Sequence, residues 1–592
     1  MLVQALAEYA DTFLAEQLSD EAWEEKPVPY FIALDRAGTF LNAVLNNVSA
    51  VRGKKTVSVP ALLSVPRSPV PRNAGLYPLL AADDIKYVLG VGPWTGKDQE
   101  KNNQERHISF AALIRKAALE TNDEGLKAAA AFYDRPDQVE AARVAVATAK
   151  AGSNLAISLL NEPLVRSPAV KAYWSKLYNT ASCGRVAKGG DAECLISGKI
   201  GAIAPTHEKI KGMASLGGQS SGVSLMSFDK DAFCSYGWEQ NANSPVAPDR
   251  AMAYVLALND LLRRDGKHRR DIAGVGFIFW TREKTEFDPM AIVDLPEPEQ
   301  IQRLLNLNPQ ADPDPNMFFM AGVSGNGARL LVRYWVAETL TTIKVNVREW
   351  FQELRVADVF SGKPSEPPKL WQLLYAIERE GKPPADRVIA LVRRSVEGPS
   401  QPLGYRMLSA ALSRLRVSSV NRLDPVRIGL IRLCLNDCVR AQNKGGSLMT
   451  ESLNTGEKHQ AYLCGRLMAV YESLQYSASK DVNQTVADRY YTLASTFPTL
   501  AFPKLEDLGN KHLRKLRRDN YGAMVRIQQD IDRLHLEIEQ AAGYKFPAAL
   551  DLDGQGRFAL GYHHQRAHQM AQAQAHKKSK NQTNLEEGQE QL

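Results

Sequence analysis

Two kinds of hydrophobic pattern alternate along the first 400 residues of the chain. Residues 29–44 (PYFIALDRAGTFLNAV) contain two apolar runs joined through Asp35 to Gly38, which predicts a β-hairpin. Residues 274–280 (GVGFIFW) are rich in β-branched and aromatic side chains, which predicts a buried strand, and residues 318–335 predict two strands around a tight turn at 324–327. Because these strands mix with helices without regular βαβ alternation, we expect an α+β fold.

Two helices in this region have clear signals. Ser167 is a favourable N-cap residue, and Pro168 follows it at the first helical position, where a missing N–H costs nothing. In residues 247–264 apolar residues recur at helical spacing on one face, which predicts a helix docked on a core. The residues of that face are Ala251, Val255, Leu258 and Leu262.

From about residue 400 the strand signals stop and helical periodicity continues almost to the end. Two segments, 521–542 and 461–474, carry apolar stripes that predict amphipathic helices. The stripe residues are Met524, Ile527, Ile531, Leu534 and Ile538 in the first segment, and Leu467, Val470 and Leu474 in the second. With breaks at Pro498, Pro503 and Pro547 these helices predict a bundle, followed by a polar, low-complexity tail that we expect to be disordered.

The size of the chain and its overall composition set limits on the class of protein. A chain of 592 residues exceeds the usual size of one hydrophobic core, so we expect several domains. It contains no apolar run of transmembrane length, which predicts no membrane association, and its first 25 residues are acidic, unlike a secretory signal. Six cysteines in so long a chain are too few for a disulfide scaffold. We therefore expect a cytoplasmic protein.

Positive charge is concentrated in patches although the formal net charge is only +7. Basic runs occupy residues 262–270 and 510–518, and spaced arginines occur from Arg406 to Arg440. The spaced arginines are Arg406, Arg414, Arg416, Arg422, Arg427, Arg432 and Arg440. Each patch is compatible with polyanion contact or with a solvated helix face.

Motifs of common cofactor and metal sites are missing from the sequence. There is no phosphate-binding P-loop, no dinucleotide fingerprint and no zinc motif, so we expect no cofactor. Cys434 and Cys438 lie one helical turn apart and are interpreted as buried cysteines of a helix. His563 and His564 have no assignable catalytic partner and are interpreted as helix surface residues.

A glycine- and serine-rich stretch, residues 207–228 (HEKIKGMASLGGQSSGVSLMSF), has features of an anion-contacting loop. Glycines at 217, 218 and 222 would let backbone N–H groups approach a phosphate. Lys209 and Lys211 would supply charge. Gln219, Ser220 and Ser221 would supply short hydrogen-bonding groups. This combination favours recognition over catalysis, and the alternative is an ordinary glycine-rich turn between two strands.

Four longer segments resemble one known family, in the expected order and over most of the chain. They are residues 207–246, 316–335 (NMFFMAGVSGNGARLLVRYW), 461–475 (AYLCGRLMAVYESLQ) and 557–566 (RFALGYHHQR). Together they resemble the large subunit of the type I-C CRISPR surveillance complex, Cascade. The family commonly has Ser-Pro-Asn-Ala-Ala-Arg where this chain has Ser-Gly-Asn-Gly-Ala-Arg at 324–329.

The resemblance implies a non-catalytic subunit. Such a subunit would sit near the 5′ handle of the guide RNA, inspect the PAM duplex, support unwinding of double-stranded target DNA, and dock the helicase-nuclease. Its other partners would be the backbone and handle-binding subunits, the small subunit and the displaced DNA strand. Because guide pairing reads the remaining sequence, the protein needs only shape, charge and a few base contacts. The residues expected to approach the PAM duplex are Lys209, Lys211, Gln219, Ser220, Asn241 and Asn243.

The resemblance also implies a domain order. We expect an α+β PAM- and handle-recognition domain over 1–270, a middle domain that changes from α+β to helical over 271–443, a helical bundle over 444–569, and a disordered tail over 570–592. The bundle resembles the small subunit, which this family can make from an internal start. Lys444-Gly445-Gly446 can be encoded by AAAGGAGGU, a strong ribosome-binding sequence, two codons before Met449, and Met468 is the competing start.

A basic run in the bundle would form its nucleic-acid face. This run would contact the phosphate backbone without sequence preference. Its residues are Lys511, Arg514, Lys515, Arg517 and Arg518.

An enzymatic alternative rests on a different residue. Gly189-Gly190-Asp191 matches the tripeptide that places a metal-binding aspartate in polymerase-palm enzymes. The alternative function is therefore a metal-dependent nuclease or nucleotidyl transferase that uses Asp191 with a second carboxylate.

Overall fold

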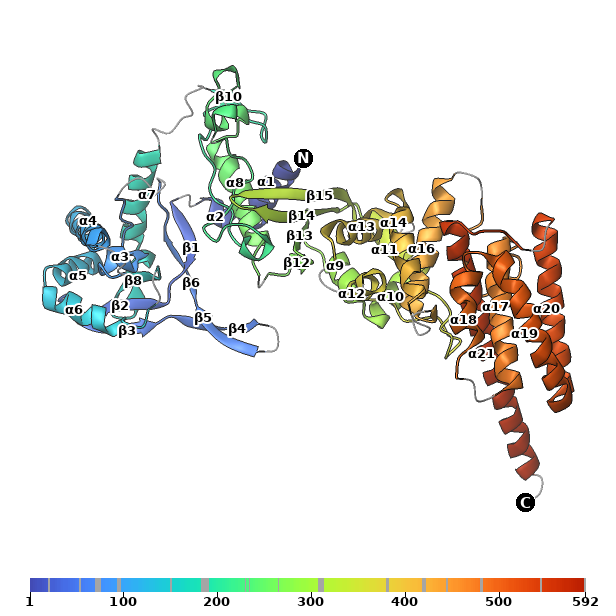
Figure 1. Cartoon of the computed structure of the whole chain (residues 1–592). Coiled ribbons are helices and arrows are strands. Elements are labelled where there is room, and N and C mark those ends of the chain that lie inside the picture. Colours follow the sequence, from blue (N-terminus) through green and yellow to red (C-terminus); the bar gives the residue numbers. More distant parts are fainter. Residues whose placement is uncertain are drawn as a thin grey trace. The chain divides into compact units, whose positions relative to one another are not determined.

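The chain folds into two compact units with α+β content. The computed structural model describes residues 1–19, 22–52, 55–69, 76–92, 97–149, 152–182, 191–228, 230–233, 235–264, 266–306, 313–378, 383–417, 422–442, 446–479, 483–543 and 546–589. Unit 1 comprises Met1–Ile210 and Ser224–Asp260, and unit 2 comprises Lys211–Val223 and Leu261–Leu592 (Figure 1). The structure is 55% helix and 16% strand, which confirms the predicted α+β class. The predicted boundary at 443/444 lies inside unit 2.

The main sheet of unit 1 contains the predicted hairpin. β2 (Tyr30–Leu34) and β3 (Phe40–Leu45) pair antiparallel, as residues 29–44 predict, and β8 (Asn154–Leu159) joins β2 in parallel. β7 (Ala82–Asp84) and β9 (Glu162–Pro163) complete this sheet. Three two-stranded sheets accompany it: β1 (Trp23–Pro27) with β6 (Leu62–Pro66), β4 (Asn47–Arg52) with β5 (Lys55–Pro60), and β10 (Ala192–Glu193) with β11 (Ile200–Gly201).

Helices pack on the main sheet of unit 1 around a core that includes Phe110, Phe132, Ile157 and Trp174. They are α3 (Ile85–Val88), α4 (Lys97–Thr121), α5 (Glu124–Tyr133), α6 (Pro136–Ala145) and α7 (Pro168–Ser182). The other helices introduced by this part of the chain are α1 (Leu2–Phe13), α2 (Ala15–Ser19) and α8 (Pro248–Leu261), whose residues do not belong to this core.

The helix starts predicted in unit 1 are correct. α7 begins at Pro168, and the Ser167 carbonyl accepts the N–H of Lys171. The Ser167 hydroxyl donates to Asp123 at 2.7 Å, whose carboxylate caps α5, so this side chain joins two helices.

Unit 2 begins with a four-stranded antiparallel sheet in the order β12-β13-β14-β15. Its strands are β12 (Arg269–Ile272), β13 (Val275–Thr281), β14 (Met317–Asn326) and β15 (Arg329–Thr339). β13 is buried along nearly its whole length, as the sequence predicts. β14 and β15 form the predicted pair of strands, but the hairpin turns at 327–328 rather than at 324–327, because residues 324–326 still pair within the ladder.

Helices follow from Leu340, about 60 residues earlier than the sequence indicated. They include α11 (Leu340–Leu354), α12 (Leu370–Ile377), α13 (Ala385–Glu397), α14 (Gly404–Leu415) and α16 (Pro425–Ala441). The short helices α9 (Pro289–Asp294) and α10 (Pro298–Asn306) lie earlier in the chain, between β13 and β14.

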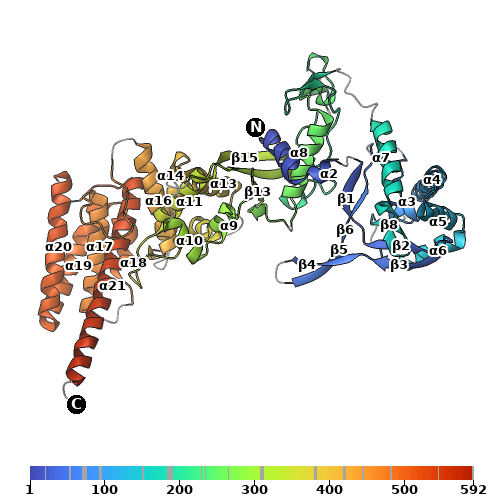
Figure 2. The same ribbon diagram turned by 180° about the vertical axis from the view of Figure 1, so that it is seen from behind.

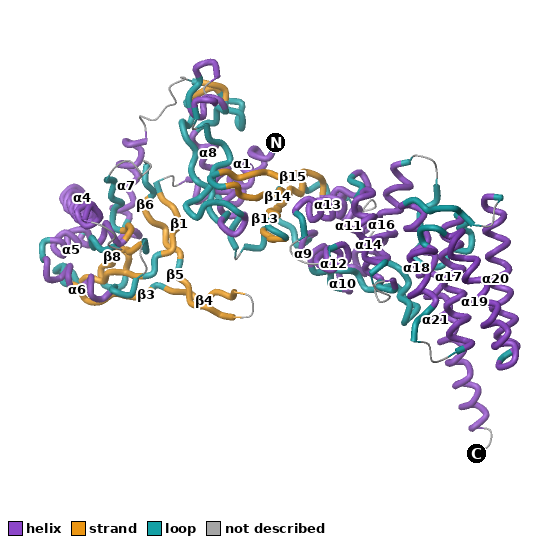
Figure 3. Tube along the Cα trace, in the orientation of Figure 1, coloured by secondary structure: helices purple, strands orange, loops and turns teal. Residues whose placement is uncertain are grey.

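The C-terminal part is the predicted helical bundle (Figure 3). It consists of α17 (Gln460–Ala478), α18 (Val486–Ala494), α19 (Pro498–Asp519), α20 (Tyr521–Ala542) and α21 (Leu552–Gln589). α17 is buried on nearly every side. Its buried residues belong to the same hydrophobic core as those of α11, α12, α13, α14 and α16. Ile531, Leu534 and Ile538 of the predicted α20 stripe are buried.

Two expectations for the bundle differ from the structure. Pro503 lies inside α19 and does not separate two helices. The segment expected to be a disordered tail continues α21 as far as Gln589, because residues such as Ala, Gln and Lys favour helix once a packed helix precedes them.

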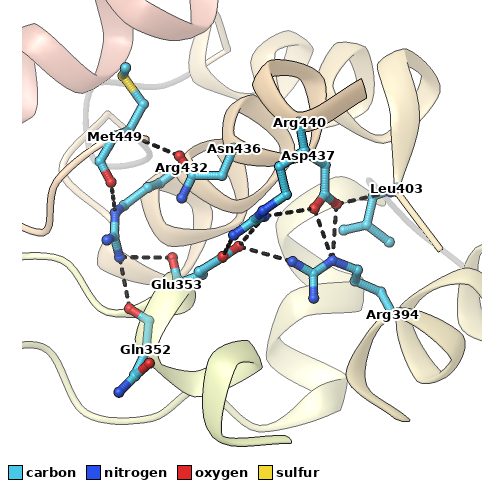
Figure 4. Close-up of polar contacts among 9 residues, drawn as sticks. All are labelled: Gln352, Glu353, Arg394, Leu403, Arg432, Asn436, Asp437, Arg440 and Met449. Atoms are coloured by element: carbon cyan, nitrogen blue, oxygen red, sulfur yellow. Dashed lines mark hydrogen bonds and ion pairs between the residues drawn. The ribbon is translucent and has the colours of Figure 1, made fainter. Parts of the chain in front are cut away.

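A buried charge network joins three helices of unit 2 (Figure 4). Arg394 of α13 is fully buried and donates to Asp437 of α16 at 3.0 Å and to Glu353 of α11 at 2.9 Å. Arg440 also pairs with Glu353, and the Asp437 carboxylate accepts the N–H of Leu403 at 3.1 Å. Every charge in this group therefore has an opposite charge beside it, which burial requires.

The two adjacent histidines of α21 are core residues, so their interpretation as surface residues is wrong. His563 donates from Nε2 to the carbonyl oxygen of Ala357 at 2.9 Å, and His564 Nδ1 lies 3.0 Å from the hydroxyl of Tyr462. Both rings are essentially inaccessible to solvent. Burial lowers the pKa of His563 to about 4, against a smaller opposing effect of Asp358, and places the pKa of His564 well below its usual range. Both imidazole rings are therefore uncharged at pH 7 and belong to the packed core around α21.

His563 makes the stability of unit 2 depend on pH. Its pKa is lower in the folded chain, so its contribution to stability is complete above about pH 6.5 and is lost as the pH falls toward 4. His563→Gln should remove about 2 kcal/mol of the stability difference between pH 7 and pH 5, measured by urea unfolding. The exposed His568→Gln is the matched control, and equal losses in the wild type and H563Q would contradict this origin.

Candidate nucleic-acid interface

The glycine- and serine-rich loop, residues 211–223, is held in unit 2 by one buried arginine. Arg269 of β12 donates to the carbonyl oxygen of Gly212 at 2.9 Å and to the hydroxyl of Ser215 at 3.0 Å. The same guanidinium forms a bidentate pair with Asp271, with N–O distances of 2.6 and 2.8 Å. A planar guanidinium with five donors can fix two backbone segments at once. Arg269 is therefore the positioning residue of the loop.

Two of the loop glycines serve close packing against the tip of the β14–β15 hairpin. Gly218 bridges Gly327, and the N–H of Gln219 donates to the Gly327 carbonyl oxygen at 2.9 Å. A Cβ atom on Gly325 would collide with the backbone nitrogen of Gly218, and one on Gly217 would lie 2.9 Å from the Gly325 oxygen. The missing side chains thus allow two backbones to touch, whereas the sequence suggested an approach to phosphate.

The rim of this loop offers polar side chains to solvent. Lys211, Gln219, Ser220 and Ser221 are exposed, and Arg333 of the adjacent hairpin is exposed while donating to Ser324 at 2.8 Å. Short hydroxyl and amide groups beside two cations can bind phosphate oxygens or base edges. The structure thus brings three of the predicted contact residues, Lys211, Gln219 and Ser220, into one rim of unit 2.

The other three predicted residues belong to unit 1. Lys209 is exposed and its Nζ donates to Ser224 at 2.8 Å. The segment before it is fixed on α8 by His207, whose Nδ1 lies 2.6 Å from the Tyr254 hydroxyl, and burial lowers the pKa of His207 to about 4. Lys209 is therefore presented from a rigid segment.

The two predicted asparagines have mainly structural contacts. Asn241 is only 2% exposed, and its backbone N–H donates to the Pro205 carbonyl oxygen at 3.3 Å. The Asn243 amide donates to the carbonyl oxygen of Gln240 at 3.0 Å, within its own turn. Two aromatic side chains of this turn, Tyr236 and Trp238, are exposed and were not singled out from the sequence.

The predicted backbone-contacting run forms an exposed row on α19. All five of its side chains are exposed, and Lys515 donates to the Ser479 hydroxyl at 3.0 Å. Arg517 and Arg518 occupy the last turn of the helix, where their positive charges interact favourably with the negative end of the helix dipole.

Part of the other arginine-rich region is internal, in contrast to both sequence interpretations, polyanion contact and a solvated helix face. Arg422, Arg427 and Arg432 are less than a tenth exposed. They pair with Asp488, with Asp424, and with main-chain oxygens at the end of α11, respectively. Asp424 lies only three residues before Arg427, but Arg427 also donates to the carbonyl oxygen of Ala376. Each of the three arginines therefore joins segments that are distant in sequence.

The proposed internal start, Met449, occupies a fixed position in the strap between α16 and α17 (Figure 4). Its N–H donates to Asn436 at 2.7 Å, and its carbonyl oxygen accepts from Arg432 at 2.8 Å. Its side chain is buried in the core. Lys444 and Gly445 lie outside the described residues.

The residues of the enzymatic alternative gain no support. Asp191 is exposed, while Gly189 and Gly190 lie outside the described residues. Among the residues that the structure describes, no three His, Cys, Asp or Glu side chains are grouped to hold a metal ion. Cys434 and Cys438 are buried in α16, which confirms their interpretation as helix core residues.

Comparison with known proteins identifies one family. The model of the family described as CRISPR-associated protein (Cas_Csd1) matches residues 6–570 of the chain. No curated protein matches the sequence. In the described part of the chain, no helix has the length and hydrophobicity that a membrane crossing requires.

Arg269→Ala should release the loop without unfolding unit 2. The loss of charge-assisted hydrogen bonds, about 1.5 to 3 kcal/mol, should accelerate tryptic cleavage after Lys211 by about 10- to 100-fold. Limited proteolysis followed by mass spectrometry measures this rate. Arg270→Ala is the control, because the described contacts of the Arg270 side chain involve the carbonyl oxygens of Lys267 and Arg269, the carboxylate of Asp288 and the ring of Phe279, and none is with the loop. Equal cleavage of the two variants would remove Arg269 from its positioning role.

Proposed function

Since the chain belongs to the CRISPR-associated protein (Cas_Csd1) family, we propose that it is the non-catalytic large subunit of a type I-C surveillance complex. In that role it recognises the PAM duplex, supports R-loop formation and docks the helicase-nuclease. Guide pairing reads the target sequence, so a protein of this kind needs a few well-placed contacts and no active site.

The observation that carries the DNA-binding part of this proposal is the loop rim of unit 2. Lys211, Gln219 and Ser220 are exposed on this loop. The loop is held by hydrogen bonds from Arg269 and by backbone contact with the β14–β15 hairpin. A rigid support reduces the entropy lost when polar side chains bind a ligand. Lys209, which belongs to unit 1, is a separate proposed contact and is held by the hydroxyl of Ser224.

The C-terminal bundle supports a second part of the proposal. The exposed basic row of α19 suits salt-dependent contact with a nucleic-acid backbone. We propose that the bundle is also made separately from Met449 as the small subunit. Met449 precedes α17, so a start there leaves all five bundle helices complete, whereas a start at Met468 would remove the first half of the central helix.

Purification from the native operon through a C-terminal tag tests assembly and the internal start together. The full chain, other CRISPR-associated proteins, a guide RNA and a short species beginning at Met449 should copurify, as identified by intact mass. Met449→Leu keeps a buried apolar side chain of similar volume and should abolish the short species. Met468→Leu, at an equally buried position, should leave it unchanged. A lone full-length chain without RNA would contradict the proposal.

The double variant Lys211→Ala, Gln219→Ala should weaken binding of the assembled complex to its target duplex. Loss of one phosphate contact and one base-edge contact corresponds to a decrease in affinity of about 10- to 100-fold. Equilibrium binding at fixed salt measures it, with subunit composition as the readout of assembly. The control removes an exposed lysine and glutamine elsewhere in unit 2, Lys363→Ala with Gln302→Ala. Equal affinities for all three complexes would exclude the rim from DNA contact.

A further inference from the structure

β3 and β4 form one continuous strand that passes from one pairing partner to the next. Figures 1 and 2 show the two elements following one another in unit 1. Asn46 lies between them, donates its N–H to the carbonyl oxygen of Pro29 at 2.8 Å, and accepts the N–H of Ala61 at 2.8 Å. The N–H and C=O of one strand residue point to the same side, so β2 and β5 pair with the same side of this strand.

The strand register identifies the backbone groups on the opposite edge. In an antiparallel pair, residues that exchange hydrogen bonds alternate with residues whose N–H and C=O point away from the partner. Asn46 belongs to the bonded set on both sides of the junction, so the odd-numbered residues face outward. Among the described residues β3 ends its sheet and β4 pairs with β5 alone, so the outward groups have no strand partner. The outward residues are Ala43, Leu45, Asn47 and Ser49.

This open edge lacks the features that usually prevent an edge strand from pairing. Residues 42–49 contain no charged residue, no proline and no glycine, none of them is buried, and Leu45 is 62% exposed. The bulge in this strand lies at Leu41, before the open stretch. The outer edge of β5 differs, because Pro60 has no N–H at an outward position. Since an uncovered apolar edge promotes aggregation, the β3–β4 edge has the properties of an edge that a partner strand covers.

The chemistry of the edge selects a polypeptide as its occupant. N–H and C=O groups that recur about every 7 Å along a strand match an extended peptide backbone. Residues 36–60 contain four Lys or Arg and no Asp or Glu. Antiparallel pairing of two copies of this segment would bring like charges together, which is unfavourable. The occupant that fits is therefore a segment of a different protein that carries Asp or Glu.

We propose that the β3–β4 edge binds an extended segment of another protein, which adds a strand beside residues 43–49. Main-chain hydrogen bonds to the outward residues supply the affinity, and an apolar residue of the segment covers the side chain of Leu45. Acidic residues of the segment complement the basic stretch 36–60. The inference rests on the proposed function only for the source of the segment, a protein that assembles with this chain.

Hydrogen exchange of the full chain in the purified complex tests the added strand directly. The N–H groups of Ala43, Leu45 and Asn47 should exchange about 100-fold more slowly in the complex than in the isolated chain, because each gains a hydrogen-bond partner. The N–H groups of Val44 and Val48 already face β2 and β5 and should change much less. Residue-resolved mass spectrometry measures this alternation. Equal rates for the outward N–H groups in both samples would overturn the proposal.

Charges placed on the edge should weaken the interaction. The isolated full chain is mixed with each of the other proteins of its operon, and Leu45→Glu with Asn47→Glu should lower the affinity for one of them about 10- to 100-fold. Thr56→Glu with Ser58→Glu makes the same charge change on the outer edge of β5 and is the matched control, since all four side chains except none are buried in the described ribbon. Equal affinities of the two variants would remove the edge from the interaction.

A proline variant and the pairwise mixtures separate the possible failures. Leu45→Pro removes an outward N–H that makes no bond to β2, so it should reproduce the loss of affinity. One bound protein with a protected edge, but no complex with guide RNA, would contradict the proposed function and support the added strand. A complex with an unprotected edge, or no pairwise binding at all, would overturn the added strand. A dimer of the isolated chain that Leu45→Pro abolishes would overturn the assigned occupant.

Discussion

The ion-paired cluster of Arg394, Glu353, Asp437 and Arg440 is the constraint on which the arrangement of unit 2 depends. Arg394 and Asp437 lie where water cannot reach them, so neither charge can exist there without the other. An apolar replacement of such a cluster can be equally stable, but it would not demand one relative position of α11, α13 and α16. Removal of a single member would strand a buried charge, which typically costs about 3 to 5 kcal/mol. The cluster therefore specifies geometry more than it adds stability.

Close backbone contact likewise fixes the relative position of the loop 211–223 and the β14–β15 hairpin. Gly218 and Gly325 lie so near each other that no side chain fits between them. Hydrogen bonds from Arg269 and from the N–H of Gln219 then fix the loop against the sheet. Since these glycines are occupied by packing, the proposed recognition of DNA rests on the side chains of the rim.

Local sequence patterns predicted the helices and strands. Contacts between segments distant in sequence determine which polar side chains are buried and which reach the surface. The hairpin at 29–44, the buried β13 and the stripe of α20 depend on periodicity within a few residues, which the sequence displays directly. The arginines of α16 look like a basic surface in sequence, yet Arg432 is enclosed because its acceptors lie at the end of α11, about 80 residues earlier. His563 was misplaced for the same reason, since its acceptor is the carbonyl oxygen of Ala357, about 200 residues earlier.

The contacts of Met449 connect the fold to the proposed separate product. In the full chain the N–H of Met449 donates to Asn436, and its carbonyl oxygen accepts from Arg432. The segment that enters the bundle is therefore bound to α16. A product that begins at Met449 has no α16. Gly556 of α21, which packs against Leu435 and Leu408 in the full chain, then faces solvent together with its apolar neighbours. Burial of such a seam contributes roughly 25 cal/mol per Å² of apolar surface. The separate bundle therefore gains stability wherever another surface covers that seam, which couples the folding of the short product to its incorporation into a complex.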